Sequence, residues 1–164
     1  MPASDRSISL RPAKPRDAGV ILAFIKELAD YEKLSHEVVA TEDAILEHLF
    51  NDNPRVEAII AEYGGSPAGF ALFFQSFSTF LGRTGIYLED LYVTVDARGQ
   101  GIGTALLKRL AEIAIERGCG RVEWAVLDWN EPAIRFYQSI GAAPMGEWQT
   151  YRLAGSALRD FARN

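Results

Sequence analysis

Two adjacent acidic residues interrupt an apolar stretch of the chain, GIYLEDLYV at 85–93. The composition of this stretch, rich in Tyr, Leu and Val, is typical of a β-strand. Since strand side chains alternate between the two faces of a sheet, Glu89 and Asp90 are expected to point in opposite directions. Carboxylates in such a setting can accept a proton or hold a cationic group, so the pair is a candidate site. The structural alternative is an acid pair satisfied by neighbouring arginines or backbone N–H groups.

A glycine-rich turn, RGQGIG at 98–103, follows between a predicted strand and a predicted helix. Glycines let a ligand approach the backbone, and a helix N-terminus offers unsatisfied N–H groups to an anion. A P-loop requires a Gly-Lys-Ser/Thr ending, which the following residues, TALLKR, do not supply. A dinucleotide fingerprint requires G-x-G-x-x-G near the first strand of its domain, whereas this spacing is G-x-G-x-G in mid-chain. The turn does fit [Q/R]-x-x-G-x-[G/A], and a plain strand–helix turn is the alternative.

A third motif, LDWNEPAIRFYQSIGA at 127–142, predicts a helix with Asn130 as its N-cap and Gly141 just past its end. Asn130 and Tyr137 are seven residues apart, about two turns, and therefore share one helix face. A tyrosine on an apolar helix face is commonly a core residue with its hydroxyl bonded, so the motif alone leaves the role of Tyr137 open.

The elements that must position these residues follow from hydrophobic periodicity. We expect strands at 7–13, 55–63, 67–77, 84–95, 121–128 and 144–153, helices at 15–34, 41–50, 101–120 and 130–142, and an optional short helix in the tail. Strands without helices between them imply antiparallel hairpins, and the strand–helix–strand unit from 84 to 128 implies one parallel pair with a right-handed crossover. The result is a mixed α/β sheet with helices on both faces.

Composition narrows the classes of function. The 164 residues carry a net charge of −5 and predict a single domain over 1–164 that is not a general nucleic-acid binder. No run approaches the roughly 20 apolar residues that cross a bilayer, and the N-terminus does not read as a secretory signal. One cysteine, Cys119, excludes an internal disulfide and favours a cytoplasmic location.

The motifs together resemble the GNAT superfamily of acyl-CoA N-acyltransferases. The turn at 98–103 is similar to the family's diphosphate loop, and the motif at 127–142 is similar to its second signature. The stretches IKELADYEKLS, YLEDLYV and VLDWNEPAIRFY narrow the resemblance to the diamine (spermidine/spermine) or thialysine acetyltransferase branch. The resemblance implies a largely antiparallel sheet with a central splayed parallel pair, acetyl-CoA as cosubstrate, no metal, and a homodimer.

The resemblance also assigns residues to the site. The implied acyl-CoA contacts are Leu91, Tyr92 and Val93 for the pantetheine arm, Arg98, Gly99, Gln100, Gly101, Ile102, Gly103 and Thr104 for the diphosphate, and Asn130, Glu131, Pro132, Ala133 and Tyr137 beside the thioester. The implied substrate pocket contains Tyr31, Glu32, Glu89, Asp90, Glu123 and Trp124.

Acetyl transfer to nitrogen needs a neutral amine, an acceptor for its proton and a donor to the departing thiolate. We assign Glu89 as base or amine-binding acid, Asp90 as substrate binder or support, and Tyr137 as the acid. The histidines, His36 and His48, are interpreted as surface residues and Cys119 as structural, which favours direct transfer in a ternary complex over an acetyl-enzyme.

Two departures from polyamine-preferring relatives bear on the substrate. Thr79 and Gln149 stand where those relatives carry acids, so a long polycation is disfavoured and a small diamine, polyamine or thialysine-like amino acid remains. The alternatives are acetylation of proteins or peptides and a non-catalytic acyl-CoA-binding module.

Overall fold

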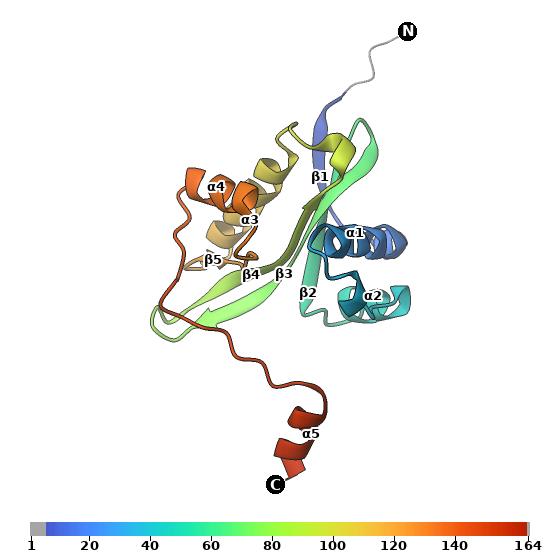
Figure 1. The fold of residues 1–164 in the computed structure, drawn as a ribbon. Helices are drawn as coiled ribbons and strands as arrows, with labels where there is room; N and C mark the ends of the chain where they lie inside the picture. The colour runs from blue at the N-terminus through green and yellow to red at the C-terminus, as the bar shows by residue number, and fades with distance from the viewer. Residues whose placement is uncertain (1–5, 164) are drawn as a thin grey trace. The chain divides into compact units, whose positions relative to one another are not determined.

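The structure, a computed structural model that describes residues 6–163, is built on a five-stranded sheet with strand order β1-β2-β3-β4-β5 (Figure 1). The strands are β1 (Ile8–Pro12), β2 (Val56–Tyr63), β3 (Ser66–Ser78), β4 (Arg83–Val93) and β5 (Val122–Glu123). The first four pair antiparallel, and β4 pairs parallel with β5. The predicted mixed sheet is therefore confirmed, with a β5 of two residues in place of the eight expected at 121–128.

Helices cover both faces of this sheet (Figure 1). The α-helices are α1 (Ala18–Tyr31), α2 (Glu42–Leu49), α3 (Ile102–Glu116), α4 (Glu131–Ser139) and α5 (Gly155–Arg163), and short 3₁₀ turns lie at Pro15–Asp17, Ser35–Glu37 and Val95–Ala97. The α1 and α2 helices lie on one face and α3 lies on the other. No helix within residues 6–163 combines the length and apolar character that a membrane span requires.

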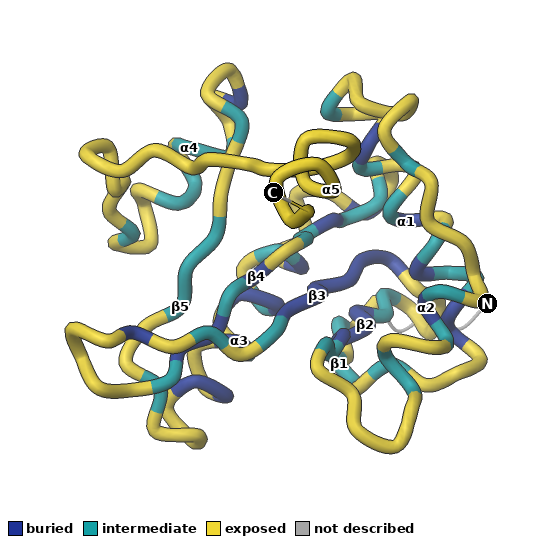
Figure 2. Tube along the Cα trace, turned by 90° about the horizontal axis from the view of Figure 1, so that it is seen from below, coloured by how far each residue is buried: buried dark blue, intermediate teal, exposed yellow. Residues whose placement is uncertain are grey.

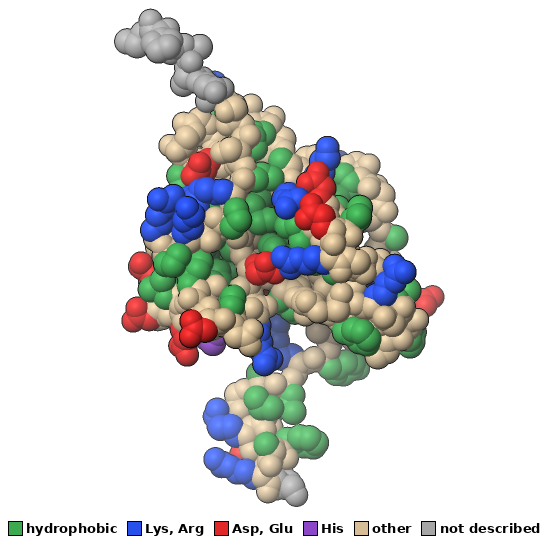
Figure 3. All heavy atoms as spheres, turned by 180° about the vertical axis from the view of Figure 1, so that it is seen from behind, with side chains coloured by type: hydrophobic (Ala, Val, Ile, Leu, Met, Phe, Trp, Pro, Cys, Tyr) green, Lys and Arg blue, Asp and Glu red, His purple; other side chains and the backbone are tan. Residues whose placement is uncertain are grey.

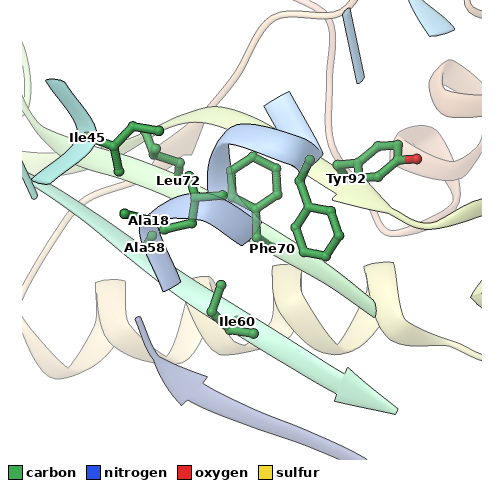
Figure 4. Packing of buried hydrophobic residues seen from close by; sticks show 9 residues of the cluster. Ala18, Ile45, Ala58, Ile60, Phe70, Leu72 and Tyr92 are labelled. Carbon is green, nitrogen blue, oxygen red and sulfur yellow. The ribbon is translucent and has the colours of Figure 1, made fainter. Parts of the chain in front are cut away.

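The core lies between the helices and the central strand, β3, which runs as a largely buried segment through the molecule (Figure 2). On the α1 side, Phe24 and Ile45 pack against Ile60, Phe70 and Leu72 of the sheet (Figure 4). On the α3 side, the helix buries the stripe that its 3.6-residue period predicts: Ile102, Leu106, Leu110 and Ile113. Side chains of β2 and β3 alternate between the α1 face and the α3 face of the sheet. Because residues paired across strands share a face, the pairing with β3 determines the face that each side chain of β4 occupies.

The chain divides into two compact units, 1–125 and 126–164. The first contains the sheet with α1, α2 and α3, and the second contains α4 and α5. The single domain over 1–164 stays a prediction. The strand expected at 144–153 is wrong, because this segment has no strand structure and its side chains are exposed. The helix left open for the tail is present as α5.

Candidate active site

The acid pair lies at an irregularity of β4. Along the ladder with β3, Leu72 pairs with Asp90 and the next residue, Phe73, pairs with Leu88, so Glu89 is an extra residue without a partner. This is a β-bulge, which interrupts the ladder and changes the direction of the strand. The regular alternation that we expected through Glu89 and Asp90 is therefore wrong.

The bulge changes which face each side chain of β4 occupies. Before it, Leu88 pairs with Phe73, whose neighbour Leu72 faces α1, so Leu88 faces α3. After it, Tyr92 packs in the α1-side cluster, although an even spacing from Leu88 would place both on one face. Asp90, which is paired with Leu72, also faces the α1 side. Because of the bulge, Leu88 is buried on the α3 side while the carboxyl of Asp90, two residues later, lies on the α1 side.

Asp90 has an unusual electrostatic environment. Burial, followed by the negative charges of Glu89 and Glu32, raises the pKa of its carboxyl to about 6. The pKa of Glu32, at the end of α1, is also raised by burial. Carboxyl groups from a strand and a helix end therefore lie close enough to interact. A proton or a cationic ligand would relieve their mutual repulsion.

The far side of the bulge is lined by Tyr87 and Glu123. They pair directly across the parallel strands, and burial, followed by the charges of Glu89 and Glu123, raises the pKa of the Tyr87 phenol. Glu123 also forms an ion pair with Arg121 at 2.9 Å. Trp124, the next residue, is half-buried. Tyr87 therefore lies close to both Glu89 and Glu123, which places Glu123 beside the acid cluster.

One edge of β4 is open beside these acids. The pairing with β5 covers Ile86 and Tyr87 and, among residues 6–163, reaches no further, while β4 continues to Val93. The N–H and C=O groups along the uncovered edge can bind an extended ligand in the manner of an added strand. This geometry fits the assignment of Leu91, Tyr92 and Val93 to a pantetheine arm.

The glycine-rich turn leads from β4 into α3. Gly99 and Gly101 have φ values of 79° and 85°, a left-handed conformation that disfavours side chains. Gly101 occupies the N-cap of α3, and no side chain caps the helix there. The N–H groups of the first turn, including those of Gly103 and Thr104, thus point to where an anion can bind. The turn therefore fits a diphosphate.

The polar side chains of the turn contact tyrosines of the protein. The Arg98 guanidinium carbon lies 5.1 Å from the centre of the Tyr31 ring and 5.8 Å from that of Tyr92. Arg98 Nε also donates to the carbonyl oxygen of Val93 at 3.2 Å. On the other side of the turn, the Tyr63 hydroxyl donates to Gln100 Oε1 at 3.2 Å.

The second unit carries the remaining predicted residues. Asn130 is buried at the N-cap position of α4 and forms no side-chain capping bond, while Pro132 occupies the first turn. Glu131 is exposed and Ala133 half-buried. Tyr137 is half-buried, with its ring centre 5.7 Å from that of Phe136. A part for these residues in the site of the first unit stays a prediction.

The two histidines and the cysteine, for which we expected no catalytic role, are not part of the acid cluster. His36 is exposed and 3.4 Å from Glu37, and His48 lies at the end of α2. Cys119 is half-buried, with its sulfur 3.5 Å from the Thr84 hydroxyl. Among residues 6–163, no cluster of His, Cys, Asp and Glu has the arrangement of a metal site. Acidic and basic side chains are interspersed on the face shown in Figure 3.

Sequence reasoning missed the bulge and the contacts of Arg98. A bulge has no single-residue signal, although two adjacent acids in an apolar strand do indicate that the alternation is broken. The Arg98 contacts join residues far apart in the chain. Tyr92 adds a further contact, because its hydroxyl, which points away from the core cluster in Figure 4, donates to Glu27 Oε2 at 2.7 Å.

These features define an acetyltransferase. Residues 23–142 match the model of the Acetyltransferase (GNAT) family, and the chain therefore belongs to that family. GNAT acetyltransferases use acetyl-CoA as cosubstrate, and this protein is an N-acetyltransferase. The family resemblance expected from the motifs is confirmed.

The relatives point to one branch of the family. Thialysine N-epsilon-acetyltransferase of Sus scrofa is 41% identical over 167 residues, which cover 95% of this chain and 98% of that protein. L-ornithine N5-acetyltransferase of Arabidopsis thaliana is 33% identical, covering 96% and 90%. A solved structure, an integron cassette protein from the mobile metagenome of V. cholerae, matches with a TM-score of 0.80 at 30% identity, covering 96% and 99%.

Proposed function

We propose that the protein transfers the acetyl group of acetyl-CoA directly to a primary amino group of a small amine, in a ternary complex. The observation that carries this proposal is the acid cluster of Glu32, Glu89 and Asp90 beside an open edge of β4. An open strand edge and an uncapped helix start suit the cosubstrate, and clustered carboxyl groups suit a cationic amine.

Acetyl-CoA supplies an acetyl thioester when it is bound. The backbone of Leu91, Tyr92 and Val93 would hold its pantetheine arm, and the N–H groups from Gly99 to Thr104 would hold its diphosphate. Asn130, Glu131, Pro132, Ala133 and Tyr137 are proposed for the far side of the thioester. The strand edge and the glycine turn of the first unit support the first two assignments.

The acids of β4 prepare the amine. An alkylammonium group has a pKa near 10.4, so about one molecule in a thousand is neutral at pH 7. The clustered carboxylates attract the ammonium form, and one of them must take its proton. The raised pKa of Asp90, about 6, lies close to the working pH, which favours Asp90 as the acceptor. Glu89, exposed on the bulge, would then hold the ammonium group.

Tyr137 is proposed to protonate the departing thiolate. A phenol has an ordinary pKa near 10 and can act as a general acid to a sulfur that leaves as an anion. Direct transfer requires no covalent acetyl-enzyme, and we propose no nucleophilic role for Cys119, whose sulfur lies beside the Thr84 hydroxyl.

A thialysine-like amino acid is the substrate class best supported by the relatives' names, with small diamines and polyamines next. Thr79, on the exposed turn between β3 and β4, and Gln149 add no carboxylate for a long polycation. Tyr31, Glu32, Glu123 and Trp124 are proposed as pocket residues. Tyr31 is the last residue of α1 and Glu32 its C-cap, while Glu123 is the last residue of the parallel pairing and Trp124 follows it, so both sides of the acid cluster contribute.

Release of the CoA thiol from acetyl-CoA, measured across thialysine, ornithine, lysine, diamines, polyamines and peptides, tests the function. We expect turnover with small amines and the highest kcat/KM with an aminoethyl or aminopropyl side chain. Turnover with peptides alone would favour a protein acetyltransferase. CoA binding without release by any amine would leave a non-catalytic binding module.

We also propose that the protein is a cytoplasmic homodimer with one N-acetyltransferase domain over 1–164. The single cysteine fits a reducing compartment. The segment after Gly141 exposes large apolar side chains, including Trp148 and Tyr151. Such side chains are typical of surfaces that another chain covers.

A further inference from the structure

Arg98 belongs to the glycine turn, and the proposed function does not explain the contacts that its side chain makes. An arginine beside a diphosphate site is expected to contact phosphate, because its charge and planar donors suit that anion. Here its guanidinium group lies over two aromatic rings, those of Tyr31 and Tyr92, and its Nε is bonded to the carbonyl oxygen of Val93. The side chain therefore turns back onto the protein.

The groups that Arg98 contacts belong to different parts of the site. Val93 ends the open edge of β4, so the bond to its carbonyl fixes the last residue of the strand. Tyr31 is the last residue of α1 and precedes Glu32, whose charge raises the pKa of Asp90. Tyr92 is itself fixed to α1 through Glu27. Arg98 thus touches the diphosphate turn, the strand edge and the end of the amine-side helix.

We propose that Arg98 is a positioning residue that couples the two halves of the site: by holding the ring of Tyr31, it makes CoA binding at the turn and amine binding at the end of α1 strengthen each other. The proposal deepens the function above and rests on it for the location of the amine. A coupling of this kind is reciprocal, so a change at either end must be felt at the other.

The energetic terms set the size of the effect. A guanidinium group over an exposed aromatic ring contributes about 0.5–1 kcal/mol, equivalent to about two- to fivefold in an equilibrium constant. The hydrogen bond to Val93 adds a similar factor. Loss of Arg98 is therefore expected to change affinities by about three- to tenfold, without abolishing binding.

The test begins with CoA affinity, measured by calorimetry on the full chain without an amine. Tyr31→Leu, which removes the ring, is expected to weaken CoA binding about threefold. Tyr31→Phe keeps the ring under the guanidinium and should retain the wild-type affinity. This comparison does not need turnover, so it remains decisive if none of the amines tested is a substrate. Equal CoA affinity in wild type and Tyr31→Leu would overturn the proposal.

Kinetics then separate positioning from phosphate binding. Arg98→Gln should raise the KM for the amine about three- to tenfold and weaken CoA binding by a similar factor, and adding Tyr31→Leu should cost less than the sum of the single changes. A phosphate ligand would instead lose CoA affinity with an unchanged amine KM and with additive effects, and that outcome would contradict the coupling.

A matched control comes from the other anchor of the same turn. Tyr63→Phe removes the hydroxyl that donates to Gln100 and leaves the Arg98 contacts in place. It is expected to weaken CoA binding slightly and to leave the amine KM unchanged. If Tyr63→Phe raised the amine KM as much as Arg98→Gln does, the coupling would belong to the whole turn rather than to Arg98, and the proposal would fail.

Discussion

At the residue scale, the site depends on the position of one extra residue. Glu89 has no partner on β3, and this places Asp90 on the α1 side, where burial, Glu89 and Glu32 raise its pKa to about 6. The sequence identified both acids and assigned the base role first to Glu89. It could not predict the raised pKa of Asp90, because burial and the distance to Glu32 depend on the tertiary structure.

Asp90→Asn tests the cost of this carboxylate to stability. Because the folded-state pKa lies above the unfolded value near 4, the folded protein binds the proton more tightly, and wild-type stability falls as the pH rises from about 4 to about 6. Above that window the loss is complete. The variant should therefore be more stable at pH 8, by about 1–2 kcal/mol after allowance for solvent screening. Denaturant unfolding at pH 4 and pH 8 measures the difference.

The same variant tests the base role. If Asp90 takes the proton, wild-type kcat/KM rises with pH through about 6, and Asp90→Asn lowers kcat by about 10²-fold or more. Glu89→Gln is the matched control and should act mainly on the KM for the amine. A larger fall in kcat for Glu89→Gln than for Asp90→Asn would reverse the two roles.

Tyr137→Phe tests the proposed acid. The ring and its contact with Phe136 are kept, so CoA affinity should be retained while kcat falls about 10²-fold. Stopped-flow turnover and calorimetric CoA binding measure the two quantities. An unchanged kcat would remove the hydroxyl from the reaction.

At the element scale, the backbone itself is adjusted to the site. Gly69 of β3 pairs with Val93, and a Cβ atom at Gly69 would lie 2.6 Å from the carbonyl oxygen of Tyr92. Gly69→Ala should therefore force β4 away at the proposed pantetheine edge, lowering the free energy of unfolding by about 1–3 kcal/mol and weakening CoA binding. At Gly103 a Cβ would meet Val93 at 3.9 Å. Gly103→Ala, which the loop motif allows, should keep both properties. Equal stability of the two variants would contradict the argument.

The ends of the helices show a second adjustment. Three helices end in the same pair of backbone hydrogen bonds. In one bond of each pair, the N–H groups of Leu34, Cys119 and Ala142 donate to the carbonyl oxygens of Ala29, Ala114 and Tyr137. In the other, the N–H groups of Lys33, Gly118 and Gly141 donate to the carbonyl oxygens of Asp30, Ile115 and Gln138. The left-handed position of this motif is glycine in α3 and α4, at Gly118 and Gly141, but it is Lys33 in α1, with φ 61°. The motif at the end of α1, beside Tyr31 and Glu32, therefore places a residue with a Cβ atom in the left-handed conformation, which is strained.

Lys33→Gly should relieve this strain and raise the free energy of unfolding by up to about 1 kcal/mol. Lys33→Ala is the control, because it removes the same charge and leaves a Cβ in the left-handed conformation. Thermal unfolding of the three proteins measures the effect. Stabilisation by Ala equal to that by Gly would attribute the gain to the lost lysine rather than to φ.

At the scale of the whole molecule, the sequence predicted the sheet and the helices packed on it better than the C-terminal segment. Periodicity identified α1, α3 and the central strands because their apolar faces pack within one unit. It failed at 144–153, where alternating residues resemble a strand but no strand of residues 6–163 pairs with them. A strand pattern shows that a segment can pair, and the partner decides whether it does.

The exposed apolar residues of that segment lead to the prediction about assembly. Trp148 and Tyr151 are 70% and 89% exposed in the single chain, and burying two such rings against a second copy would stabilise a dimer by several kcal/mol, on the order of 2 per ring. We expect wild-type protein to sediment at twice the 18.1 kDa chain mass and the Trp148→Ser/Tyr151→Ser variant to shift toward the monomer. Val39→Ser, which alters an equally open apolar residue of the first unit at 88% exposure, should leave the dimer intact. A monomeric wild type, or a double variant that remains dimeric at low micromolar concentration, would show that these rings do not form the contact.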